Sequence, residues 1–163
     1  MMMNRFLSLC LSVVLFAAPA MADELFPLAH CRIIDTRFST PPTAIQIGQE
    51  YVFSAMLADN TPQGGEALNC GVPPGASAIL ASVVTINPAG PGYLKAWDTC
   101  GVEPAKATAL NFFKQWDVAV PNYPISPGRL ALIKLSAAGT FSVESYWFGA
   151  GALAVDVEGY LMP

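Results

Sequence analysis

The sequence predicts an all-β protein, an antiparallel two-sheet β-sandwich with an immunoglobulin-like or jelly-roll-like arrangement of strands. Short runs rich in β-branched and aromatic residues recur along the chain and are separated by clusters of Gly, Pro and Asn. After residue 22, no long segment has the 3.6-residue apolar spacing of an amphipathic helix. The 163 residues are 53% hydrophobic and 12% charged, which excludes a disordered chain and allows one domain with a buried core.

The first 22 residues have the features of a secretory signal peptide. Arg5 precedes an apolar run from Phe6 to Ala18, and Ala20-Met21-Ala22 ends the segment with small residues at both ends. A retained membrane span is not expected, because the apolar run is shorter than the roughly 20 residues that a spanning helix needs. We therefore expect cleavage after Ala22, a single domain over 23–163, and a periplasmic, extracellular or cell-surface location.

Nine strands are predicted in the body of the chain. In order they are Arg32–Thr36, Glu50–Leu57, Ala76–Asn87, Tyr93–Asp98, Ala107–Phe112, Asp117–Val120, Arg129–Ser136, Thr140–Tyr146 and Ala152–Val157. Alternation of apolar and polar residues is clearest in the last two, as in half-buried antiparallel strands. Ala137-Ala138-Gly139 predicts a hairpin in which Gly139 takes a positive φ. The Pro-rich segments at 40–42, 87–92 and 121–124 are expected in loops or at sheet edges.

Composition excludes several classes of function. Without residues 1–22, seven basic and twelve acidic residues remain, a net charge of −5 with no basic run, so nucleic acid is not an expected partner. His30 is the only imidazole, and it is expected in a mobile N-terminal segment that leads to the first strand. The sequence has no G-x-S-x-G, H-E-x-x-H, C-x-x-C or EF-hand pattern. Neither a metal nor a cofactor is expected, and the protein is predicted not to be an enzyme.

A hydrolase that uses two carboxylates stays open as a minor alternative, because glycosidase chemistry requires only acidic side chains at a suitable separation. Its candidate residues are Asp35, Asp98, Asp117, Glu144, Asp156 and Glu158.

Three cysteines remain after the signal segment: Cys31, Cys70 and Cys100. Export implies an oxidising compartment, so one disulfide and one leftover thiol are expected. The leftover cysteine is either buried and inert or links two chains.

The segment from Cys31 to Arg37 places charges among apolar residues. An extended backbone puts Cys31, Ile33, Asp35 and Arg37 on one face. Asp35 and Arg37 then pair locally or each meets a partner on a neighbouring strand. An ion pair that fixes strand register is the favoured interpretation over a ligand contact.

Aromatic residues are the predicted binding residues. They lie at strand ends or beside Pro/Gly loops, where an exposed ring can stack on a sugar or contact another protein. The candidates are Trp97, Trp116, Trp147, Tyr93 and Tyr123, with Tyr146 beside them.

An ordered series of motifs resembles a secreted bacterial β-domain family with the pattern C-R-x-x-D-T-R, C-G-[IV]-P, L-N-F and D-V-x-G-Y. Here they are the segments at 31–37, 70–73, 110–112 and 156–160, where Glu158 occupies the variable position of the last. The resemblance covers Leu25 to Pro163. It implies a β-domain in exported or cell-surface proteins, without a settled activity.

The resemblance also implies specific residue roles. Cys31 pairs with Cys70, which leaves Cys100 as the odd cysteine. Asp35, Arg37, Asn111 and Asp156 are polar residues within apolar strands, so we expect a mutual hydrogen-bond network that holds the sheets in register.

Together these observations predict a secreted, non-catalytic module that binds polysaccharide or another surface component through exposed aromatic residues. The alternative is a structural subunit that assembles through strand edges or through an interchain Cys100 disulfide.

Overall fold

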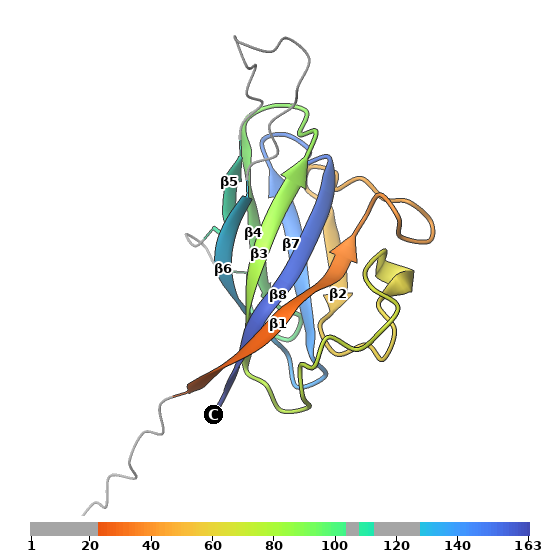
Figure 1. Cartoon of the computed structure of the whole chain (residues 1–163). Coiled ribbons are helices and arrows are strands. Elements are labelled where there is room, and N and C mark those ends of the chain that lie inside the picture. The colour runs from red at the N-terminus through yellow and green to blue at the C-terminus, as the bar shows by residue number, and fades with distance from the viewer. Residues whose placement is uncertain (1–22, 104–107, 113–127) are drawn as a thin grey trace, which may run out of the picture.

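The computed structural model describes residues 23–103, 108–112 and 128–163 (Figure 1). It confirms the all-β sandwich, with two four-stranded antiparallel sheets and no α-helix in these ranges. The predicted signal segment, the predicted strand Asp117–Val120, Trp116 and Tyr123 lie outside the described residues. In the described ranges, no helix is long and apolar enough to cross a membrane.

The first sheet, called here the β8 sheet, has the strand order β1-β8-β3-β6. Its strands are β1 (Glu24–Asp35), β8 (Ala152–Met162), β3 (Ala78–Ile86) and β6 (Gly128–Lys134). The second, the β7 sheet, has the order β2-β7-β4-β5. Its strands are β2 (Glu50–Ser54), β7 (Thr140–Tyr146), β4 (Gly92–Asp98) and β5 (Leu110–Phe112). The chain therefore crosses between the two layers several times, as Figure 1 shows.

The core lies between the inner faces of the two sheets. Ile79, Val155 and Val157 of the β8 sheet are fully buried, as are Leu94 and Phe141 of the β7 sheet. Burying a side chain of this size stabilises a fold by about 1.5–3 kcal/mol. The predicted alternation in β7 is present, although Ser142, on the polar side of that alternation, is also shielded from solvent and donates a hydrogen bond to Glu50.

The described loop that includes the short 3-10 helix η1 (Thr61–Gln63) lies along the edge of β1. The Glu66 N–H donates to the Arg32 carbonyl at 2.9 Å, and Ile34 forms an isolated bridge with Gly64. The approach is so close that a Cβ on Gly65 would lie 2.5 Å from the Arg32 carbonyl oxygen, so only glycine fits there. A disulfide between Cys31 and Cys70 fastens the same loop, as the motif resemblance implied.

Two strands extend well beyond the predicted ends. β1 begins at Glu24 rather than Arg32, and β8 continues to Met162. The added residues pair with each other, Glu24 opposite Met162, and the Phe26 and Tyr160 rings stack with centroids 5.2 Å apart. The expectation that His30 lies in a mobile approach is wrong, because His30 is within β1.

The turn at Ala137-Ala138-Gly139 is present, and Gly139 has the predicted positive φ, +73°. The predicted hairpin is wrong in one respect: β6 belongs to the β8 sheet and β7 to the β7 sheet. The Gly139 N–H donates to the Ser136 carbonyl, and the Gly139 carbonyl accepts from Ala55 on a third segment. The turn therefore carries the chain from one layer to the other.

Candidate functional site

Two of the predicted binding residues meet in an aromatic cluster on the outer face of the β7 sheet, formed by Tyr93, Tyr146 and Trp147. Tyr93 on β4 is directly opposite Tyr146 on β7, and their rings stack with centroids 5.0 Å apart and planes 6° apart. The Trp147 ring meets Tyr93 edge-on at 5.7 Å. Cross-strand partners point to the same face of a sheet, so register places these rings together.

Trp147 is the most exposed ring of this cluster. It follows the end of β7, its residue is 71% exposed, and its φ is +73°. A bulky residue in the left-handed region is rare, because its side chain crowds its own backbone. The backbone thus holds an apolar ring toward solvent at a conformational cost, an arrangement often associated with binding sites.

Charged groups support the cluster from one side. Lys95 forms an ion pair with Glu103, and its Nζ lies 4.8 Å from the Tyr146 ring centroid. The Tyr146 hydroxyl donates to Glu103 at 2.6 Å. Burial and the neighbouring Glu103 and Glu144 carboxylates raise the pKa of Tyr146 above its usual range, so the phenol stays neutral. Hydrogen bonds from Lys95 and Tyr146 lower the pKa of Glu103.

Asn111 lies beside the cluster instead of in the expected polar network. It is exposed on β5, directly opposite Tyr93, and is therefore on the outer face of the β7 sheet. The prediction that Asn111 joins Asp35, Arg37 and Asp156 is wrong, because those residues belong to the opposite side of the sandwich. An exposed amide next to aromatic rings offers both a donor and an acceptor to a ligand.

Trp97 lies apart from the cluster. It is half-buried four positions further along β4, where it lines a cavity together with Leu132 of β6. Cys100 is close by in the sequence, exposed and without a disulfide partner. Of the candidate binding residues in the described ranges, the structure brings together Tyr93 and Trp147 and places Trp97 in different surroundings.

Comparison with family models, curated proteins and solved structures finds no match for this chain.

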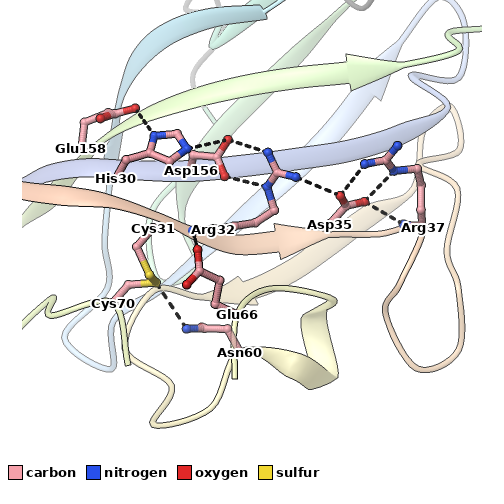
Figure 2. Close-up of polar contacts among 10 residues, drawn as sticks. All are labelled: His30, Cys31, Arg32, Asp35, Arg37, Asn60, Glu66, Cys70, Asp156 and Glu158. Atoms are coloured by element: carbon pink, nitrogen blue, oxygen red, sulfur yellow. Dashed lines mark hydrogen bonds and ion pairs between the residues drawn. A yellow bond between two sulfur atoms is a disulfide. The ribbon is translucent and has the colours of Figure 1, made fainter. Parts of the chain in front are cut away.

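A second group of polar residues forms a continuous row of charges along β1 and β8 (Figure 2). Asp156 accepts hydrogen bonds from Arg32 on both carboxylate oxygens, at 2.7 and 2.9 Å. Arg32 also donates to Asp35, which accepts two further side-chain bonds from Arg37, the shorter at 2.6 Å. At the other end, His30 contacts Glu158 at 2.8 Å and Asp156 at 3.6 Å. We call these six residues the charged row.

A bulge in β1 explains the composition of the charged row. Arg32 is opposite Asp156 and Ile34 is opposite Val155, so one extra residue is inserted at Ile33. Ile33 and Ile34 are both buried, and the side chains of Arg32 and Asp35 meet although they are three positions apart. The expectation that Cys31, Ile33, Asp35 and Arg37 all share one face is therefore wrong, because the bulge separates the buried Cys31 and Ile33 from the side of the strand where Asp35 meets Arg37. The local pairing of Asp35 with Arg37, one of the two alternatives, is present.

Asp35 and Asp156 are the buried members of the charged row, at 1% and 4% exposed. Burial works to raise the pKa of Asp35, but hydrogen bonds from Arg37 and the positive charges of Arg37 and Arg32 outweigh it and leave the pKa below its usual value.

The charged row borders an open cavity of about 360 Å³ that Phe38 and Glu66 also line. In the described ranges, no group of three His, Cys, Asp or Glu side chains is arranged to hold a metal ion.

The surroundings of His30 predict that the stability of the protein depends on pH. Its hydrogen bond to Glu158 and the charge of Asp156 raise its pKa above 6.5, so its contribution to stability is present below that pH and lost as pH rises through the raised value. The effect is expected to be small because the side chain is 59% exposed. Chemical unfolding of the wild type and of His30→Gln between pH 5 and pH 8 should show a difference that shrinks as pH rises. A difference that is constant across this range would contradict the assignment.

Sequence reasoning missed Arg32, Lys95 and Glu103 as members of these groups. Arg32 belongs to the C-R-x-x-D-T-R motif, but its contact with both Asp35 and Asp156 depends on the bulge. No residue type in β1 predicts that bulge. Lys95 alternates with Tyr93 and Trp97 in β4, and this alternation was the available signal that a lysine shares the outer face with the aromatic residues.

Proposed function

We propose that this protein is a secreted, non-catalytic module that binds polysaccharide through the outer face of the β7 sheet. The observation that carries the proposal is the aromatic cluster, in which the exposed Trp147 ring is braced against the stacked Tyr93 and Tyr146 rings. Braced rings lose little conformational freedom on binding, so more of the contact energy appears as affinity.

The chemistry around the cluster suits a sugar. The apolar C–H face of a pyranose packs on an aromatic ring, and its hydroxyl groups require nearby donors and acceptors. Asn111 and Glu103 supply such groups within the same outer face or beside it. Polysaccharide is favoured over a large protein surface because the aromatic group is small and is bordered by polar residues.

Other features support a binding role over hydrolysis. Glycosidases keep one carboxyl group protonated next to a second carboxylate. Asp35 and Asp156, two of the candidates for that chemistry, are instead both engaged by Arg32, and the pKa of Asp35 is lowered. The signal-like segment at 1–22 and the resemblance to exported β-domains support a location outside the cytoplasm.

The proposal is tested by retention on insoluble polysaccharides. The double variant Tyr93→Ala/Trp147→Ala is expected to lower the affinity for any retaining polysaccharide at least about tenfold, because it removes the exposed ring and its support. Depletion assays on cellulose, chitin and a mixed β-glucan measure the affinity of wild type and variant.

Phe38→Ala is the matched control. Phe38 is 67% exposed and belongs to a loop beside the charged row, so its loss removes an exposed aromatic ring outside the aromatic cluster. Retention should be unchanged in this variant. Equal retention of the double variant and the wild type, or equal losses in both variants, would overturn the assignment of the site.

A further inference from the structure

One cavity lies between the edges of β4 and β6. β5 pairs only with Gly92–Leu94, so the second half of β4 has no described strand beyond it on that side. The cavity there has a volume of about 450 Å³, within the range of small-molecule sites. Its walls include Trp97, Val102 and Leu132, and Val102 and Leu132 are among the exposed large apolar side chains.

Two opposite charges line the same cavity without neutralising each other. Lys134, at the end of β6, forms no ion pair within the described part of the chain. Asp98, at the end of β4, accepts the Cys100 N–H through Oδ1 at 3.1 Å, and its Oδ2 has no described hydrogen-bond donor. The cavity therefore combines apolar walls, one free ammonium group and one partly free carboxylate.

We propose that this cavity binds an apolar α-amino acid as a zwitterion. The ligand carboxylate pairs with Lys134, its ammonium group pairs with Asp98, and its side chain packs on Trp97, Leu132 and Val102. A zwitterion replaces the water at both protein charges, whereas an apolar ligand displaces that water without replacing its hydrogen bonds and a singly charged ligand replaces it at one charge alone. This site is separate from the aromatic cluster and does not depend on polysaccharide binding.

The test uses three related probes and two variants, measured by isothermal titration calorimetry on the purified protein. L-leucine carries both charges, leucinamide lacks the carboxylate, and N-acetylleucine lacks the ammonium group. Lys134→Gln is expected to weaken leucine and N-acetylleucine about fivefold and to leave leucinamide unchanged, because an exposed ion pair contributes on that scale. Asp98→Asn, which keeps an acceptor for the Cys100 N–H, should weaken leucine and leucinamide about fivefold but not N-acetylleucine.

Arg129→Gln is the matched control, since it removes an exposed positive charge from the other end of β6 and should leave all three affinities unchanged. The proposal is overturned if no binding heat appears at about 10 mM leucine. It is also overturned if the three probes bind equally well, or if Arg129→Gln acts like Lys134→Gln. Retention on polysaccharide, measured in parallel, reports on the aromatic cluster alone and separates failure of one site from failure of the other.

Discussion

Replacing Cys31 and Cys70 together by alanine is expected to lower the free energy of unfolding by about 4 kcal/mol. The two cysteines are separated by 39 positions, and a cross-link of that length removes much of the conformational freedom of the unfolded chain. The bond also fastens the loop around η1 to β1, so its loss is expected to loosen the hydrogen bonds that cover the β1 edge. Urea unfolding of wild type and double variant under non-reducing conditions measures the difference.

Cys100→Ala is the control for this experiment, because Cys100 is exposed and outside the disulfide. Its unfolding midpoint should match that of the wild type. A double variant within about 1 kcal/mol of the Cys100 control would contradict the prediction, and would mean that the loop is held by its hydrogen bonds and packing alone.

The strands in the middle of the sandwich could be predicted because their side chains alternate between core and surface. Thr140–Tyr146 has the predicted bounds, and Ala78–Ile86 differs by only a residue or two at each end. The first part of β1 could not be predicted, because Glu24–His30 are exposed or half-buried and their sequence does not alternate between apolar and polar residues. They are extended because they pair with the end of β8, and such pairing is a property of the tertiary structure.

The sequence allowed us to predict which residue types form the candidate binding site, but not which of those residues lie next to one another. Tyr93 and Trp147 are suitable aromatic residues at strand ends, yet their proximity depends on the register between β4 and β7. The same register places Asn111 beside them through β5 rather than near Asp35. Register is fixed by which faces are buried and by turn geometry, so residues distant in the sequence are assigned to one face only when the sheet is assembled.

Replacing Arg32 by glutamine is expected to lower the free energy of unfolding by about 3 kcal/mol at neutral pH. Among the residues that the structure describes, Arg32 alone contacts both Asp35 and Asp156, and both carboxylates are almost completely shielded from solvent. In the variant Asp35 keeps Arg37, but the remaining described cation near Asp156 is the more distant His30. Removing one partner of a buried ion pair is costly because the remaining charge is left without compensation.

The pH dependence identifies the cause of that loss. The pKa of Asp35 is lower in the folded protein than in the unfolded chain, where it is near 3.8. The ionised Asp35 therefore stabilises the wild type above about pH 3.8, and this stabilisation is lost as pH falls through the lower pKa of the folded state. Without the positive charge of Arg32, the pKa of Asp35 is lowered less, so the variant loses less stability than the wild type when Asp35 takes up its proton. The difference between wild type and Arg32→Gln should therefore be constant from about pH 7 to pH 4 and narrow as pH falls below about 4, whereas Arg129→Gln should match the wild type throughout. A difference that does not change with pH would mean that Arg32 acts through the packing of its aliphatic stem on β8 and not through its charge.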